Sequence, residues 1–337
     1  MEEKRTDDFN KETDVIETGR EIEERKKKLI DFLKRKKDWI FYLILAFIIF
    51  IGTYIRTLNI SKLKDITTGT WTLGPDLDPF LFLRWAEYIV KNGSLMAHDA
   101  MRNVPLGFDT AGEMKLISYM IAWFHNILSA LSLSDSVTYS AILFPVVMFV
   151  FTAIAFFLFA KKIFYKENKI IKNSIALIAT LLFVLVPSLL PRTIAGIPEK
   201  ESVAFFFMFM AFYFFLEAFT SEKFKFNLIF GVLAGIMTGL MALVWGGMIF
   251  VFFTISSAVL ISFILGKIKF KEFIIYSVWL FSSFILMIPF STRYAPMNLI
   301  VSLSTGFSIF VFLSIGIGLF IIKYDNKFNI RKKTKLP

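Results

Sequence analysis

The sequence contains no cysteine, only two histidines, and only 19% charged residues among its 337 positions. Without cysteine, a disulfide scaffold and a thiolate metal site are both excluded. A Gly-rich phosphate loop, a nucleophile elbow and a zinc motif are also missing. Soluble domains carry about 25% charged residues, whereas 56% of this chain is hydrophobic and 42 residues are Phe. The composition therefore excludes a soluble enzyme.

The hydrophobic residues fall in blocks of roughly 18 to 24, the length that crosses a hydrocarbon core of about 30 Å. The sequence thus predicts an all-α, polytopic membrane protein with about eight transmembrane helices and both ends in the cytoplasm. The expected spans are 39–58, 137–160, 173–190, 202–219, 227–244, 247–265, 273–290 and 298–322.

The net charge of +11, from 38 Lys and Arg against 27 Asp and Glu, does not indicate nucleic-acid binding. In a membrane protein, basic residues gather in cytoplasmic loops and fix the orientation. Residues 1–38 are read as a charged cytoplasmic tail, too long and too acidic for a cleavable signal. Residues 323–337 are read as a basic cytoplasmic end.

The apolar stretch 116–133 is the main ambiguity in the topology. If it crossed the membrane, the lysines between 161 and 172 would lie outside. If it does not cross, those lysines and the ones in every later basic loop are cytoplasmic, as the positive-inside rule requires. We therefore expect an external helix at 116–133, a large external loop at 59–135, a second external loop at 191–201, and a multi-pass protein of the cell membrane.

The first external loop carries Asp78, which Pro79 follows directly. An Asp before a Pro is a good helix start, since the Asp can cap and the Pro fits the first turn. A carboxylate at the mouth of a helix bundle could equally bind a divalent cation through its oxygens. Both interpretations remain open from the sequence.

The second external loop carries Glu199 and Glu201 at the start of a span. Ionisable groups next to the membrane core are costly and tend to be functional. Alternatively, the two acids only favour the next helix by placing negative charge at its amino end. Both acidic loops are expected on the outer face, so one shared metal site is possible.

His98 and His125 are interpreted as structural, because neither has a second histidine at a metal-ligand spacing. The pair His98 and Asp99 is kept as a reserve candidate. A stripe of small residues in the fifth span favours close helix packing and no chemistry; its members are Gly231, Gly235, Gly239 and Ala242.

Several motifs, in this order, resemble the catalytic subunit of oligosaccharyltransferase, of the archaeal type. Asp78-Pro79-Phe80 with Arg84 and Glu87-Tyr88 is similar to an Asp-Pro-Tyr motif before an external helix. The further motifs are Pro105-Leu106-Gly107, Arg192-Thr193-Ile194-Ala195-Gly196 followed by Glu199-Lys200-Glu201, and Trp245-Gly246-Gly247. The resemblance runs from about residue 39 to residue 322.

The resemblance implies a glycosyltransferase C-type membrane fold and transfer of an oligosaccharide from a polyprenyl (dolichyl) phosphate or pyrophosphate lipid to Asn of an Asn-X-Ser/Thr sequon. It implies that Asp78, Glu199 and Glu201 bind Mg²⁺ or Mn²⁺, and that Asp78 also faces the acceptor amide as the catalytic residue. Arg192 is the candidate for substrate binding. Membrane lipid and the acceptor polypeptide are the expected partners, and nucleic acid is not.

Two features depart from the family. Its second acidic motif usually begins with Asp, where this sequence has the longer Glu199. The family also continues with further spans, another catalytic Glu and a soluble domain containing Trp-Trp-Asp, whereas none of the six Trp here are adjacent. The sequence therefore predicts the amino-terminal membrane part of such an enzyme, without the soluble domain and inactive alone.

Three alternatives remain. Another polyprenyl-phosphate-sugar glycosyltransferase would also have acids in its first outer loop, but the second acidic motif argues against it. A lipid or solute transporter predicts charged residues within the spans, which are nearly free of them. A purely structural membrane scaffold predicts no effect from replacing Asp78 or Glu199.

Overall fold

Long apolar helices make up most of the structure, a computed structural model that describes residues 23, 25 and 38–328. The chain divides into two units, residues 1–47 and 48–337, and helix α2 (Asp38–Thr57) runs from the first into the second. Most of the expected tail 1–38, and residues 329–337 of the expected basic end, lie outside the described residues.

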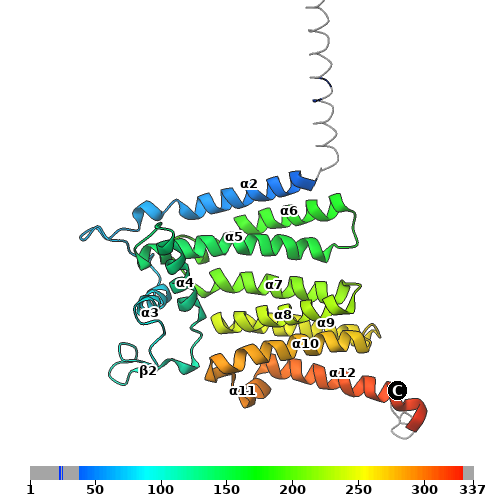
Figure 1. Ribbon diagram of the computed structural model, residues 1–337. Coiled ribbons are helices and arrows are strands. Elements are labelled where there is room, and N and C mark those ends of the chain that lie inside the picture. Colours follow the sequence, from blue (N-terminus) through cyan, green and yellow to red (C-terminus); the bar gives the residue numbers. More distant parts are fainter. Residues whose placement is uncertain (1–22, 24, 26–37, 329–337) are drawn as a thin grey trace, which may run out of the picture. The chain divides into compact units, whose positions relative to one another are not determined.

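The second unit is a bundle of helices with a group of short elements at one end (Figure 1). The bundle helices are α5 (Val137–Ile163), α6 (Lys169–Leu185), α7 (Lys200–Thr220), α8 (Phe224–Val244), α9 (Ile249–Ile264), α10 (Phe270–Met287) and α12 (Leu303–Phe328). Short 3₁₀ turns η3 (Leu190–Arg192), η4 (Gly246–Met248), η5 (Ile288–Phe290) and η6 (Thr292–Tyr294) and the short helix α11 (Pro296–Val301) connect them.

Within residues 23, 25 and 38–328, seven helical segments are long and apolar enough to cross a membrane. The expected third span, 173–190, is instead the 17-residue helix α6, about 26 Å long at 1.5 Å per residue. It ends at Leu185 because Pro187 disfavours helical backbone at Val186, which is extended. The chain then continues through η3 and returns to the end of the bundle where α5 begins.

The last expected span, 298–322, also differs from the structure. The extended Ser302 separates α11 from α12, so the long helix begins only at Leu303. Gly306 makes this break possible, since a side chain there would place its Cβ 2.4 Å from the Ile300 carbonyl oxygen. The other six helices lie within a few residues of the expected spans.

The expected small-residue stripe of α8 packs against α10. A Cβ added at Gly235 would lie 2.6 Å from the Trp279 carbonyl oxygen, and one at Gly239 would lie 2.9 Å from Leu286 Cδ2. The close approach also allows the Trp279 indole to donate a hydrogen bond to Thr238 Oγ1 at 3.0 Å. Small residues and interhelical hydrogen bonds stabilise helix pairs where lipid supplies no hydrophobic driving force, as expected for this stripe.

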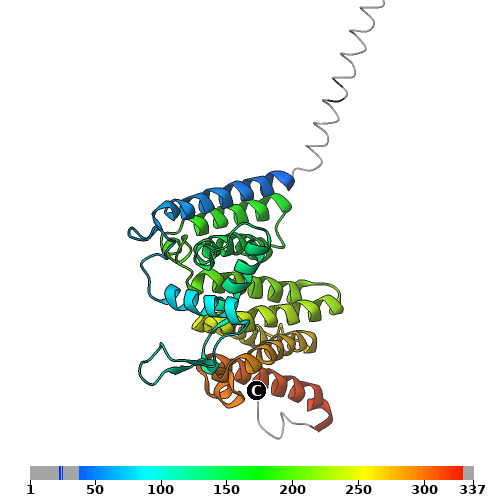
Figure 2. The same cartoon turned by 60° about the vertical axis from the view of Figure 1, so that its left-hand side comes forward.

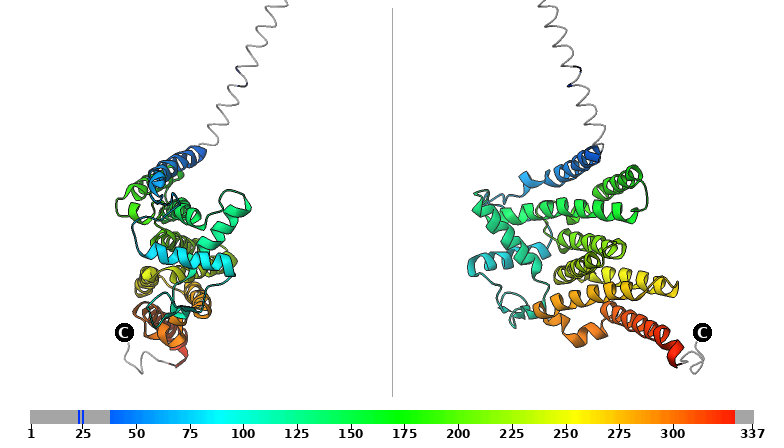
Figure 3. Two further views of the ribbon diagram at one scale, coloured as in Figure 1. Left: turned by 90° about the vertical axis from the view of Figure 1, so that its left-hand side faces the viewer. Right: turned by 45° about the vertical axis from the view of Figure 1, so that its right-hand side comes forward.

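The first long loop folds across one end of the bundle (Figures 2 and 3). It contains η1 (Ile60–Lys62), α3 (Asp78–Asn92), the two-residue strands β1 (His98–Asp99) and β2 (Phe108–Asp109), η2 (Thr110–Gly112) and α4 (Leu116–Ala130). The strands pair antiparallel. Helix α4 covers most of the stretch 116–133 for which a helix was expected; it has only 15 residues and buries one face against α3 and α5.

Candidate functional site

Backbone hydrogen bonds bring the two predicted acidic loops together. The Gly74 amide donates to the Gly196 carbonyl at 2.8 Å, and the Gly196 amide donates to the Ile142 carbonyl at 3.0 Å. Gly196 has a φ of +84°, and a Cβ there would lie 2.5 Å from Leu63 Cδ1. Only glycine fits this contact, which fixes the loop before Asp78 against the loop before Glu199.

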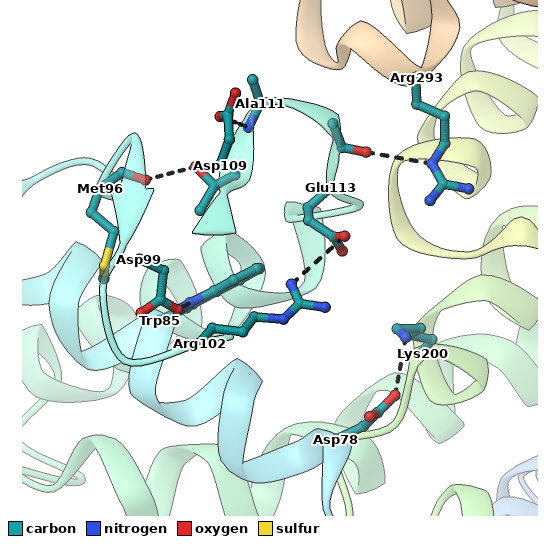
Figure 4. Close-up of polar contacts among 12 residues, drawn as sticks. Asp78, Trp85, Met96, Asp99, Arg102, Asp109, Ala111, Glu113, Lys200 and Arg293 are labelled. Atoms are coloured by element: carbon teal, nitrogen blue, oxygen red, sulfur yellow. Dashed lines mark hydrogen bonds and ion pairs between the residues drawn. The ribbon is translucent and has the colours of Figure 1, made fainter. Parts of the chain in front are cut away.

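Asp78 is the first residue of α3, and Pro79 lies in the first turn, as the sequence predicts. The capping role is wrong, however, because Leu77 is the N-cap residue and no side chain caps the helix. The carboxylate turns instead toward the second loop, where Lys200 Nζ lies 3.0 Å from Asp78 Oδ2 (Figure 4). The Asp78 side chain is 53% exposed, so its carboxylate is accessible at the site.

Glu199 is the N-cap residue of α7, and its carboxylate accepts a hydrogen bond from the Lys200 amide at 3.3 Å. Glu201 follows in the first helical turn, so both acids do favour the amino end of the helix. The Glu199 side chain is only 5% exposed. Burial, followed by the charges of Glu201 and Asp76, raises its pKa to about 7.

Arg192 lies between two acids of the site. Its Nη1 is 3.6 Å from Asp76 Oδ2 and 3.7 Å from Glu199 Oε1. The guanidinium is about half-exposed, which leaves part of it open to solvent. Sequence reasoning did not single out Asp76, although its position two residues before Asp78 was the available signal.

The donor set of this site suits a hard divalent cation, which prefers carboxylate oxygens. Burial is the main cause of the raised pKa of Glu199, and the charges of Glu201, Asp76 and Asp78 add to it. A divalent cation would offset the charge of these four neighbouring carboxylates, so the chemistry of the residues suits a cation. In the described part of the chain, no three His, Cys, Asp or Glu side chains already lie close enough together to hold one.

The buried Arg56 anchors the second acidic loop through hydrogen bonds. Its Nε donates to Thr193 Oγ1 at 2.7 Å, and its two terminal nitrogens donate to the Gly52 and Val184 carbonyls at 3.0 and 3.1 Å. Its own carbonyl accepts from the Ala195 amide at 2.9 Å. Sequence reasoning missed this residue; an arginine inside the first apolar run was the signal, and it is an exception to the expected lack of charge in the spans.

A buried carboxylate fixes the far part of the first loop. Asp99 accepts hydrogen bonds to both oxygens from Arg84 and one from the Met101 amide at 3.1 Å. It also accepts one from the Trp85 indole at 2.9 Å (Figure 4). These contacts give Asp99 a role in tying β1 to α3. Asp99 therefore has a structural role in this network, which argues against the reserve candidate site that paired it with His98.

The other sequence-selected residues of the loops also have structural contacts. His125 Nδ1 lies 2.9 Å from Ser140 Oγ, which joins α4 to α5 and agrees with its structural interpretation. Gly107, with a φ of +72°, lies directly against the His98 ring. Gly247 lies under the Trp245 ring at the end of α8, where a Cβ would be 2.1 Å from the indole.

The Asp99 network makes the stability of the fold acid-sensitive. Arg84, with the other donors, holds the pKa of Asp99 at about 2. A carboxyl group with a lowered folded pKa stabilises the fold above its unfolded value of about 3.9, and that contribution disappears as the pH falls toward 2. We expect Asp99→Asn to lose about 1–2 kcal/mol at pH 6, after allowance for the partly exposed Arg84.

The measurement is thermal unfolding in detergent from pH 6 to pH 2. The wild type should lose stability relative to Asp99→Asn as the pH falls below 4, so that the two curves converge. A constant difference between them over this range would contradict the assigned pKa.

Comparisons with known proteins agree with this architecture. The family model "Oligosaccharyl transferase STT3, N-terminal" matches residues 36–333. A search of curated proteins matched none of them. The fold is similar to solved structures of an oligosaccharyltransferase from Archaeoglobus fulgidus, AglB, at 21% identity.

Three of these structures differ in what they contain. One is in complex with an inhibitory peptide and a dolichol-phosphate (TM-score 0.70; 89% of this chain, 35% of that chain). One is in complex with Zn and sulfate (TM-score 0.69; 86% of this chain, 37% of that chain). One is tethered to an acceptor peptide with the NVT sequon (TM-score 0.70; 90% of this chain, 36% of that chain).

This chain therefore spans about a third of the length of those proteins. At this identity the likeness shows the fold, a multi-pass helical membrane domain. The family model covers nearly the whole chain, including both acidic loops. The chain therefore belongs to the oligosaccharyl transferase STT3 family and matches the N-terminal part of that family.

Proposed function

We propose that this chain is the membrane part of an enzyme that transfers an oligosaccharide from a polyprenyl phosphate or pyrophosphate lipid to Asn of an Asn-X-Ser/Thr sequon. The main observation in support is the meeting of Asp78 with Glu199 and Lys200, 121 and 122 positions away, at one end of the bundle. Family membership supplies the reaction class.

The orientation that suits this reaction is the one that the loop charges favour. The acidic loops face the outside of the cell membrane and the amino terminus lies in the cytoplasm. The lipid-linked donor is then within the bilayer beside the site, and the acceptor polypeptide arrives from the outer face. The solved AglB structures hold a dolichol-phosphate and a sequon peptide, which is the pair of ligands proposed here.

Asp78, Glu199 and Glu201 are the proposed ligands of Mg²⁺ or Mn²⁺, which would offset the charge that develops on the leaving phosphate. Asp78 also accepts a hydrogen bond from the acceptor amide and orients its nitrogen. Its present partner, Lys200, must then release it. Arg192 is the proposed contact for phosphate oxygens, because its guanidinium is half-exposed next to the acids.

The test of this function is glycan transfer to peptides. The protein produced from its complete gene, in membranes with a polyprenyl-linked donor, should glycosylate an Asn-Val-Thr peptide. Gln-Val-Thr and Asn-Val-Ala peptides are the matched controls, and mass spectrometry of the peptide is the readout. Glycan on a serine or threonine, or on a lipid acceptor, would indicate the alternative class of polyprenyl-phosphate-sugar glycosyltransferases and overturn the proposal.

A further inference from the structure

Lys200 places a positive charge among the acids of the candidate site. It is the first residue of α7, directly between Glu199 and Glu201 in the sequence. Its ammonium nitrogen is 3.0 Å from Asp78 Oδ2 (Figure 4) and lies over the Phe82 ring, 5.3 Å from the ring centre. The Lys200 side chain is 25% exposed. One anionic and one aromatic neighbour therefore hold the ammonium in this position.

The other cation of the site makes different contacts. Arg192 Nη1 lies 3.6 Å from Asp76 Oδ2 and 3.7 Å from Glu199 Oε1. Among the residues that the structure describes, only Lys200 forms an ion pair with Asp78. The counter-charge of the Asp78 carboxylate therefore comes from Lys200 alone.

The position of this ammonium opposes the binding of a metal ion at Asp78. A divalent cation binds carboxylate oxygens at little more than 2 Å, and a second positive charge at the same carboxylate repels it. The other oxygen of Asp78 does not avoid this repulsion, because both oxygens belong to one carbon. A metal ion bound at Asp78 must therefore displace Lys200.

We infer that Lys200 is an internal counter-ion, which competes with a divalent cation for Asp78 and thereby sets the affinity of the site for that cation; this rests on the proposed function, in which Asp78 is a ligand. With Lys200 in place, two cations face the four carboxylates of the site, and without it Arg192 alone remains. The pair is partly exposed, so the competition lowers the affinity several-fold and does not block binding.

The experiment is a titration of the full-length protein, in detergent, with Mn²⁺, with the free ion measured by electron paramagnetic resonance. Lys200→Gln should bind Mn²⁺ at least about fivefold more tightly than the wild type, because the ion no longer displaces a paired ammonium. Lys200→Met, which keeps an unbranched stem, should show the same gain. Lys200→Arg keeps the charge and the ion pair, so it should bind Mn²⁺ no more tightly than the wild type.

The matched control is Lys91→Gln, which removes an exposed lysine from the last turn of α3. This residue lies 13 positions after Asp78 in the same helix, or about 20 Å along its axis. At that distance an exposed charge is largely screened at physiological salt. The variant should therefore change the Mn²⁺ affinity by less than about twofold.

A double-mutant cycle separates competition for Asp78 from the general effect of removing a positive charge. In an Asp78→Asn background, Glu199 and Glu201 remain to bind Mn²⁺, but Lys200→Gln should raise the affinity less than about twofold. An equal gain in both backgrounds, or no gain in Lys200→Gln and Lys200→Met, would overturn the role of Lys200 and leave the cation site standing. An affinity that Asp78→Asn leaves unchanged would instead remove the proposed cation site, and this role with it.

Discussion

Replacing Asp78 by asparagine should reduce oligosaccharide transfer to a sequon peptide at least about 100-fold, or about 2.7 kcal/mol of transition-state stabilisation. The neutral amide keeps the size of the side chain but cannot supply the anionic oxygen that a divalent cation and the acceptor amide require. Folding should be little affected, because the ion pair of Asp78 with Lys200 is about half-exposed. Such pairs contribute at most about 1 kcal/mol to stability.

Two measurements separate the functional loss from a structural one. Transfer is followed with a sequon peptide, and Mn²⁺ binding is followed by titration of the same preparation. The matched control is Asp135→Asn, which removes one exposed carboxylate from the turn between α4 and α5 and should change neither quantity more than about twofold. Full transfer by the Asp78→Asn variant, with unchanged Mn²⁺ affinity, would remove the metal assignment.

The positions of the helices were largely predictable from the sequence, because a run of about 20 apolar residues has few stable alternatives to a membrane-crossing helix. The helix ends were less so. α6 ends before Pro187 and α12 begins after Ser302, and both breaks depend on local backbone conformation rather than on hydrophobicity. A count of apolar residues therefore placed the element but not its boundaries.

Candidate site residues could be selected from the sequence, but the contacts that these residues make could not be predicted. Asp78 and Glu199 stand out as acids beside apolar spans. The pairing of Asp78 with Lys200, 122 positions later, depends on the bond between Gly74 and Gly196. Such a tertiary contact leaves no periodic pattern in the sequence. Capping by Asp78, one of the two interpretations that the sequence left open, was wrong because the helix begins one residue earlier than expected, with Leu77 as its N-cap.

Replacing Arg56 by methionine should lower the free energy of unfolding by about 2–4 kcal/mol and also weaken cation binding at the acidic site. Methionine has a similar apolar stem, but the variant loses the three hydrogen bonds of the guanidinium to Thr193, Gly52 and Val184. Hydrogen bonds from charged donors contribute about 1.5–3 kcal/mol each, and buried acceptors left without a partner are costly. The variant also loses the cation–π contact in which the guanidinium carbon of Arg56 lies 3.6 Å from the centre of the Phe149 ring.

The effect on the site follows from the loop that Arg56 holds. Thr193 and Ala195 both form hydrogen bonds with this residue, and Glu199, the N-cap residue of α7, follows Ala195 by only four positions. Because the Glu199 carboxylate is oriented by this loop, its loosening should lower Mn²⁺ affinity even at temperatures where the variant is fully folded. Arg56→Lys keeps the charge without the planar fork and should be intermediate in both measurements.

A double-mutant cycle tests whether the two effects share one cause. Thr193→Val removes the acceptor of the 2.7 Å bond while keeping the volume of the side chain. If Arg56 acts on the site through this residue, the losses of Mn²⁺ affinity in the single variants will not add in the double variant. Additive losses would show that the two residues act independently, and unchanged Mn²⁺ affinity in Arg56→Met would confine this arginine to stability alone. The non-additive outcome makes Arg56 a positioning residue, through which the first span orients the acids of the second loop.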